Sequence, residues 1–320
     1  MRLHRPDDAR AELNISQNRS RKICLYAIGG NALSNPLSPN EQNDVMDAVL
    51  NDVFDLIEAG YSVVLTHGNG PQVGELLLME ESHGKQPEGL DHWVAATQGT
   101  LGHDIATRLD GLLTSRKRHE QVATLLTRVA VDPEDSAFAM PTKPIGPTIT
   151  GDVPEHWTVG QTSNGLRRLV PSPRPLQILD SDAIESLVNA GAIVLACGGG
   201  GIPVLVDETG FHGVEAVIDK DLVSSLLAQT LSVDLFIIST AVDSIKINFG
   251  TSDETSLRLI AAADLKAHLV AGQFPIGSMG PKVESLISAK CSHPSMEVIL
   301  CLPGQALAAV RGEAGTTVEN

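Results

Sequence analysis

The sequence contains few cysteines and few aromatic residues. Its four cysteines, Cys24, Cys197, Cys291 and Cys301, lie far apart in 320 residues, and no C-x-x-C pair occurs. This spacing excludes a disulfide framework and a cysteine-based zinc site. We therefore expect buried thiols in a reducing compartment, with Cys197 and Cys301 inside strands. Aromatic residues make up 3% of the chain, so the core must be built from Val, Ile, Leu and Ala.

Long apolar runs are also missing. The longest uncharged apolar run, around residues 190–206, contains five glycines and a proline, which excludes a membrane span. Residues 1–21 are polar and mixed in charge, and they lack the apolar region of a signal peptide. By elimination we expect a cytoplasmic protein in which residues 1–21 form a polar N-terminal tail.

Basic residues are scarce relative to acidic ones. The chain has 23 Lys and Arg against 39 Asp and Glu, which gives a net charge of −16. Such a surface repels phosphate backbones and anionic lipids, so we expect neither nucleic acid nor a membrane as a partner. A phosphorylated ligand would need a few well-placed cations and main-chain amides. The histidines include no H-x-x-x-H or H-E-x-x-H pair, so we expect no protein metal site.

Aliphatic strands alternate with amphipathic helices after the tail. Strands are expected at 22–28, 61–66, 192–197, 233–239 and 296–301, and helices at 43–60 and 180–191. Strands that are apolar throughout and separated by helices are typical of a parallel sheet covered on both faces. The sequence therefore predicts an α/β fold that binds ligands outside the carboxyl ends of its strands.

Residues 133–175 interrupt this alternation. They are rich in Pro, Gly, Ser and Thr, but they also contain Phe138, Ile145, Trp157 and Val159. A disordered linker is one interpretation. The apolar residues favour another, a small inserted subdomain of loops and hairpins at about 133–170, within a single domain over 22–320.

Glycine-rich loops are expected at the ends of strands. They lie at residues 29–31, 67–71, 198–201 and 277–280. Glycine lets the main chain approach a ligand closely, so several N–H groups can point at one anion. One such loop can be a purely steric turn, but four at one edge of a sheet indicate a common anion pocket. None fits the P-loop pattern, and no G-x-G-x-x-G follows the first strand, which disfavours a dinucleotide oxidoreductase.

Two lysines stand at the starts of predicted helices. Asp219 can cap a helix that begins with Lys220, and Pro281 suits the first turn of a helix that carries Lys282. A cation at this end faces the positive pole of the helix dipole, unless an anion is bound there. We therefore predict that both lysines stabilise a transferring phosphoryl group and that Asp221 holds them. Solvated surface lysines are the alternative.

Lys143 lies in the proline-flanked segment PTKPIG. This rigid setting suits a lysine that reaches over the site from the inserted subdomain. A plain loop lysine fits the local sequence almost equally well.

Seven segments together resemble one known family. They are AIGGNAL, THGNGPQVG, VDPEDSAFAMPTKPIG, RRLVPSPRP, ACGGGGIPV, GVEAVIDKDLVSSLLA and GSMGPKVES, in this order, and the match runs from about residue 22 to the end. The chain resembles the carbamate kinases of the amino acid kinase superfamily. This implies a three-layer αβα sandwich with a mainly parallel central sheet, a protruding subdomain and a homodimer. It also implies reversible phosphoryl transfer between carbamoyl phosphate and ADP, giving ATP and carbamate, with Mg²⁺ on the nucleotide phosphates.

The resemblance implies roles for individual residues. The phosphoryl site would be lined by Gly29, Gly30 and Asn31, and the carbamate side by Gly68, Asn69 and Gly70. Lys220 and Lys282 would stabilise the transferring group, with Asp221 organising them and Lys143 reaching in from the subdomain. Nucleotide contacts are implied for Thr240, Ala241, Val242, Asn248, Gly277, Ser278, Met279 and Gly280.

Several positions depart from the family pattern. Ala241 stands where a carboxylate is usual, and the subdomain looks short between Gly146 and Arg167. The segment GQFPIGSMG has Gln273 where histidine is usual, and Thr97 begins the element that usually reads SQG. Two alternatives therefore stay open. One is a kinase of the same fold with another small carboxylate acceptor, and the other is a nucleotide- or metabolite-binding relative with weakened catalysis.

Overall fold

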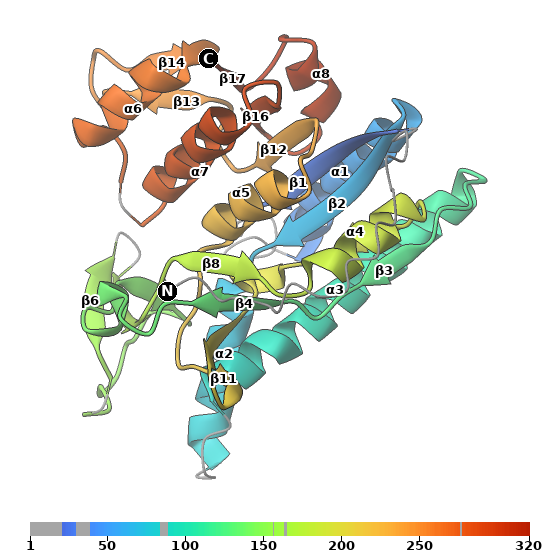
Figure 1. Ribbon diagram of the computed structural model, residues 1–320. Helices are drawn as coiled ribbons and strands as arrows, with labels where there is room; N and C mark the ends of the chain where they lie inside the picture. Colours follow the sequence, from blue (N-terminus) through green and yellow to red (C-terminus); the bar gives the residue numbers. More distant parts are fainter. Residues whose placement is uncertain (1–20, 30–38, 84–88, 156, 163–164, 276) are drawn as a thin grey trace.

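An eight-stranded sheet forms the centre of the molecule. The computed structural model describes residues 21–29, 39–83, 89–155, 157–162, 165–275 and 277–320. The strand order is β15-β17-β16-β12-β1-β2-β9-β3 (Figure 1). The strands are β1 (Lys22–Ile28), β2 (Tyr61–His67), β3 (Val122–Thr124), β9 (Ile193–Leu195), β12 (Leu235–Ser239), β15 (Leu259–Ala261), β16 (Glu297–Cys301) and β17 (Thr316–Glu319). Neighbouring strands run parallel except β16 and β17.

Helices cover both faces of this sheet. The α-helices among the described residues are α1 (Pro39–Glu58), α2 (Gly70–His83), α3 (Leu90–Ser115), α4 (Ser181–Asn189), α5 (Lys220–Thr230), α6 (Ala262–Val270), α7 (Met279–Ser292) and α8 (Ala306–Val310). Of these, α2 packs on α3 and β5 instead of on the central sheet. One core lies between the sheet and α4, α5, α6 and α7, and the other between the sheet and α1, α3 and α8. None of the described helices is both long and apolar enough to cross a membrane.

The first strand shows how the sequence builds these two cores. Ile23, Leu25 and Ala27 face one core, and Cys24 and Tyr26 face the other. Successive side chains of a strand point to opposite faces, so a strand buried on both sides must be apolar throughout. The predicted α/β fold, a three-layer sandwich around a mainly parallel sheet, is confirmed.

Smaller sheets flank the central one. One has the order β11-β10-β4-β8, one is a hairpin of β13 and β14, and one has the order β5-β7-β6. Their strands are β4 (Arg128–Val131), β5 (Lys143–Ile145), β6 (Val159–Thr162), β7 (Gly165–Val170), β8 (Pro175–Ile178), β10 (Ile202–Asp207), β11 (Gly210–Gly213), β13 (Ile245–Ile247) and β14 (Thr255–Leu257). In Figure 1, β6 projects away from the central sheet. The β5-β7-β6 sheet lies within the predicted subdomain at 133–170, whose status as a separate unit stays a prediction.

The cysteine predictions need two corrections. Cys24, Cys197 and Cys301 are buried free thiols, but Cys291 is exposed on α7. Cys197 does not lie inside a strand: β9 ends at Leu195, and Cys197 has a left-handed φ of 53°. The apolar run 192–197 continues past the strand because the turn that follows it is itself buried.

Candidate active site

Parallel strands bring the first glycine loops to one edge of the sheet. Ile28 of β1 is in register with His67 of β2 and with Ser239 of β12. Gly29 follows directly, and its N–H donates to the Ser239 oxygen at 2.8 Å. A Cβ atom on Gly29 would lie 2.6 Å from that oxygen, so a larger residue does not fit. Gly30 and Asn31, which complete the predicted phosphoryl loop, lie outside the described residues.

The glycine run at 198–201 packs against residues at this edge of the sheet. A Cβ atom on its first three members would lie 2.4 Å from Nε2 of His67, 2.2 Å from Nδ2 of Asn69 and 2.2 Å from the Ile218 oxygen, respectively. Glycine is therefore required here by close packing as well as by the positive φ of the second, third and fourth members. The run brings the end of β2 next to the segment that leads into α5.

The start of α5 is held in place by side chains. Asp219 caps the helix, because its Oδ1 accepts the Asp221 N–H at 2.9 Å, as the sequence predicts. The Ser224 hydroxyl donates to the Lys220 oxygen at 2.8 Å and lies 2.7 Å from the hydroxyl of Thr66 on β2. Lys220, the first residue of α5, is thereby fixed against the carboxyl end of β2.

Asp221 bridges two lysines from different helices. Its Oδ1 lies 2.7 Å from Nζ of Lys220, and its Oδ2 lies 3.0 Å from Nζ of Lys282 in the first turn of α7. These side chains are 6%, 9% and 17% exposed, in the order Asp221, Lys220 and Lys282. Lys143 reaches the same place from β5 and forms an ion pair with Asp219. The structure thus brings together all four residues that the sequence predicts as catalytic.

The ammonium group of Lys220 makes an ion pair but no hydrogen bond with any described residue. Its ion-pair partner is Oδ1 of Asp221, at 2.7 Å. An ammonium carries three donors, and a buried cation with unused donors is costly. An anion with several acceptor oxygens suits this position.

The charges of the cluster depend on one another. Burial would raise the pKa of Asp221, but Lys220 and Lys282 hold this pKa well below its ordinary value. Burial lowers the pKa of Lys220, and Lys282 adds to this effect while Asp221 opposes it. Burial would also lower the pKa of Lys282, but Asp221 outweighs it and raises this pKa. In this cluster Asp221 stays ionised and Lys282 stays protonated, whereas Lys220 loses its proton more readily than an ordinary lysine.

The predicted nucleotide residues lie on the C-terminal elements. Thr240 follows β12, and its N–H donates to the Cys301 oxygen at 2.9 Å. Thr240 is buried, Val242 is half-buried and Ala241 is exposed. Asn248 has a left-handed φ of 53°, and its N–H donates to Oε1 of Gln273 at 2.8 Å. Gln273, a departure from the family pattern, thus supports the loop that holds Asn248.

The fourth glycine loop needs a correction. Residues 277–280 do not follow a strand: Gly277 and Ser278 precede α7, and Met279 and Gly280 begin it, after α6. The Gly280 N–H donates to the Pro275 oxygen at 2.9 Å. The loop therefore contributes the N-terminus of the helix that carries Lys282, rather than a further strand end.

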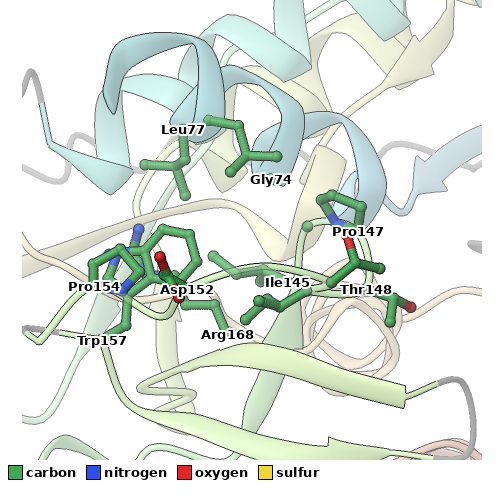
Figure 2. Close-up of a pocket in the computed structure, with 13 residues that line it drawn as sticks. Gly74, Leu77, Ile145, Pro147, Thr148, Asp152, Pro154, Trp157 and Arg168 are labelled. Carbon is green, nitrogen blue, oxygen red and sulfur yellow. The ribbon is translucent and has the colours of Figure 1, made fainter. Parts of the chain in front are cut away.

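A pocket of about 300 Å³ lies between α2 and the β5-β7-β6 sheet (Figure 2). It is lined by Gly74, Leu77, Leu78, Ile145, Gly146, Pro147, Thr148, Ile149, Thr150, Asp152, Pro154, Trp157 and Arg168. None of the site lysines lines it. A Cβ atom on Gly74 would lie 1.9 Å from Cα of Gly146, so α2 and the end of β5 touch through main chain. This contact sets the position of β5 and hence of Lys143.

Sequence reasoning did not assign some residues that build the site. The Gln98 amide donates to the Gly198 oxygen at 2.9 Å and accepts the Thr127 N–H at 2.8 Å. The Asn69 amide donates to the Thr97 hydroxyl at 2.8 Å. The available signals were the Thr97-Gln98-Gly99 element and the position of His67 directly before Gly68, but neither shows what the side chains contact.

Comparisons with known proteins agree with this architecture. The amino acid kinase family model matches residues 22–299. Carbamate kinase 1 of Enterococcus faecium is 40% identical over 289 residues, which are 87% of this chain and 93% of the relative. Carbamate kinase 3 of Staphylococcus aureus (strain USA300) is 38% identical over 307 residues, which are 92% and 99% of the two chains.

A solved structure has the same fold over almost the whole chain. Carbamate kinase from Giardia lamblia bound to AMP-PNP superimposes with a TM-score of 0.84 at 33% identity, over 94% of this chain and 99% of that one. With this similarity and the family match, the chain belongs to the amino acid kinase family, among the carbamate kinases.

Proposed function

We propose that this protein is a carbamate kinase, which transfers a phosphoryl group reversibly between carbamoyl phosphate and ADP to give ATP and carbamate. The observation that carries the proposal is the pair of lysine ammonium groups on one carboxylate, beside the glycine run, with Lys220 buried and Lys282 partly buried. Phosphoryl transfer depends on positioning and on neutralisation of charge. Relatives at about 40% identity that are carbamate kinases support the same activity.

In this proposal the lysines act on the transferring group. The bond between the phosphorus and the carbamoyl oxygen breaks, and a bond to a terminal phosphate oxygen of ADP forms. Carbamate leaves as an anion, so the protein need not take up or release a proton. Lys220 and Lys282 would neutralise the phosphoryl oxygens, and Asp221 would hold the two cations at a fixed separation. The N–H of Gly29 already donates to the Ser239 oxygen, so this group is not available to the phosphoryl oxygens.

Lys143 would join the cluster from the subdomain. Its partner is Asp219, so its ammonium already lies at the start of α5. A phosphoryl group bound there would offer it a second anionic partner, and the subdomain would then cover the site. Gly68, Asn69 and Gly70 would lie on the carbamate side, next to the glycine run.

The nucleotide would bind over the C-terminal elements. We place it against Thr240, Ala241, Val242 and Asn248 and against residues 277–280. The similar Giardia lamblia structure, bound to AMP-PNP, supports nucleotide use. Without a carboxylate at Ala241, one polar contact of the family pattern is lost, which would lower the affinity for the nucleotide.

Mg²⁺ would accompany the nucleotide. Within the described residues, no three His, Cys, Asp or Glu side chains gather into a metal site. Mg²⁺ commonly takes only one or two carboxylates together with water and substrate phosphates. Asp219, which is 11% exposed at the start of α5, would supply one only by sharing the oxygen that pairs with Lys143, because its other oxygen caps the helix. The residues therefore fit an ion that arrives on the phosphates, where it would neutralise part of their charge.

The direct test is ATP formation from ADP and carbamoyl phosphate by the purified protein. We expect Lys220→Ala and Lys282→Ala each to lower the rate roughly 10²–10³-fold, the usual cost of removing one transition-state donor. Lys266→Ala changes an exposed lysine on α6 and serves as the matched control. Wild-type rates in both site variants would contradict the proposal.

Two further points belong to the proposal. A panel of small carboxylates in the ATP-consuming direction separates a carbamate kinase from a kinase with another acceptor, and ligand binding without turnover would indicate a weakened relative. The homodimer is carried over from the resemblance to the family.

A further inference from the structure

We propose that His67, together with Asn69, recognises the amino group of carbamate and carbamoyl phosphate and thereby separates them from acetate and acetyl phosphate. The inference rests on the proposed function and deepens it. It assigns a role to a buried side chain that phosphoryl transfer itself does not use.

His67 lies at the meeting point of the site. It is the last residue of β2 and is in register with Ile28, the residue that precedes the phosphoryl loop at 29–31. Its ring packs on Gly198, where a Cβ atom would lie 2.4 Å from Nε2 and 2.6 Å from Cε1. The charge of Lys220 acts on the ring strongly enough to lower its pKa, after the larger effect of burial. His67 therefore packs on the glycine run, and its neighbour Thr66 contacts Ser224 in the first turns of α5.

The hydrogen bond of the His67 ring shows which ring nitrogen can accept a hydrogen bond from a substrate. Nδ1 lies 3.0 Å from the Gly68 oxygen, and a carbonyl oxygen can only accept, so Nδ1 carries the proton. Burial and Lys220 keep the ring neutral, so Nε2 has a lone pair. Nε2 makes no hydrogen bond with any described residue, and Lys220 does not donate to it. His67 thus offers an acceptor in a site otherwise dominated by donors.

Asn69 offers a second acceptor, which also packs on the glycine run. Its Nδ2 donates to Oγ1 of Thr97 at 2.8 Å, and that hydroxyl in turn donates to the Val94 oxygen at 2.8 Å. This chain of bonds fixes which end of the amide is oxygen. Oδ1 would lie 2.6 Å from a Cβ atom on Gly199, the glycine next to the one that His67 contacts. Two neutral acceptors therefore lie over consecutive glycines.

The substrate requires such acceptors. Carbamate differs from acetate by an amino group in place of a methyl group, and its planar nitrogen presents two N–H donors. The lysine ammonium groups and the main-chain N–H groups of the site pair with substrate oxygens, but as donors they cannot pair with substrate N–H groups. A site that pairs substrate N–H groups rejects an analogue without them, because its buried acceptors are then left unpaired. A neutral histidine meets this need without adding a fourth cation to the three lysines of the site.

The test compares two phosphoryl donors, carbamoyl phosphate and acetyl phosphate, with ADP as the acceptor of both. The quantity measured is the ratio of kcat/KM for carbamoyl phosphate to kcat/KM for acetyl phosphate. His67→Asn keeps a donor to the Gly68 oxygen but removes the group at Nε2. His67→Phe removes both polar groups and fills the space. His67→Gln places an amide oxygen near the Nε2 position. Thr127→Val is the structural control, because the Thr127 hydroxyl accepts the Cys197 N–H at 3.0 Å beneath the glycine run.

We expect His67→Asn and His67→Phe to lower the ratio about tenfold, which corresponds to one hydrogen bond, and His67→Gln to restore part of it. Thr127→Val should change both donors by the same factor. If the wild type does not turn over acetyl phosphate, the inhibition constant of acetyl phosphate in competition with carbamoyl phosphate is measured in place of kcat/KM. A ratio unchanged in both His67→Asn and His67→Phe refutes this inference alone. A wild-type protein that forms no ATP from carbamoyl phosphate refutes the proposed function, and the inference with it.

Discussion

At the residue scale, Asp221 decides the electrostatics of the site. Its two oxygens each contact one ammonium, and the three side chains are at most 17% exposed. Without the carboxylate, two cations would lie close together in a medium that screens charge poorly. One lysine would then release its proton, and Lys220 is the one whose pKa is already lowered by burial and by Lys282.

We therefore expect Asp221→Asn to lower the free energy of unfolding at pH 7 by about 3–5 kcal/mol, as when a buried ion pair loses one member. Urea denaturation measures this loss. The pKa of Asp221 is lower in the folded state than in the unfolded state. Its contribution is therefore complete above the unfolded pKa and disappears as the pH falls through the folded pKa.

Glu313→Gln is the control for this experiment, because Glu313 pairs with Arg311 while both side chains are more than half exposed. Exposed pairs contribute little. The contact of Asp221 with the two lysines is not the cause if both variants lose the same free energy of unfolding. It is also not the cause if the difference between wild type and Asp221→Asn persists unchanged at strongly acid pH.

At the element scale, the contact between α2 and β5 positions the subdomain lysine. Gly74 and Gly146 touch through main chain beside the 300 Å³ pocket, and Gly146 has a positive φ of 67°. In Figure 2, Gly74 and Leu77 lie on the helical side of the pocket, and Ile145 and Pro147 lie on the opposite side. Ile145 stands two residues after Lys143 on the same strand, so a displaced contact moves the lysine.

Gly74→Ala should therefore push β5 away from α2 and weaken the Lys143–Asp219 pair. We expect kcat/KM for carbamoyl phosphate to fall by up to roughly 10²-fold, the effect of a misplacement of about 1 Å. Gly111→Ala on α3 is the matched control, because a Cβ atom there meets nothing within 4 Å. It should keep full activity and gain up to about 1 kcal/mol of stability. An active Gly74→Ala variant would show that α2 does not position the lysine.

At the scale of the whole molecule, local and global charge oppose each other. The net charge is −16, whereas the site combines three lysines with two aspartates. The lysines act over a few ångströms, and the acidic surface acts over the Debye length, about 30 Å at 0.01 M salt and about 10 Å at 0.1 M. Salt therefore weakens the long-range repulsion before it weakens the contact attraction.

For this reason KM for carbamoyl phosphate should fall severalfold as ionic strength rises from about 0.01 to about 0.1 M, the range over which the Debye length shortens most. Initial rates at fixed Mg²⁺ and ADP measure this, with KCl and tetramethylammonium chloride compared to separate screening from binding of a particular cation. A KM that rises steadily with salt over this range would mean that the lysines dominate at long range as well.

Local chemistry alone determined much of this protein. Apolar strands that alternate with helices predict the parallel sheet, because the pattern of buried positions is written along each element. Asp219 as a helix cap and Lys220 as the first helical residue follow from neighbours in sequence. The motif order predicts the family, and the family match confirms it.

Only the tertiary structure decided which groups meet. Asp221 and Lys282 are 61 positions apart, and their contact depends on how α5 packs along α7. The pairing of Lys143 with Asp219, the place of the loop at 277–280 between helices and the packing of His67 on Gly198 depend in the same way on distant elements. A sequence pattern fixes which face of an element is buried, but the partner across that face is set by the packing of the whole fold.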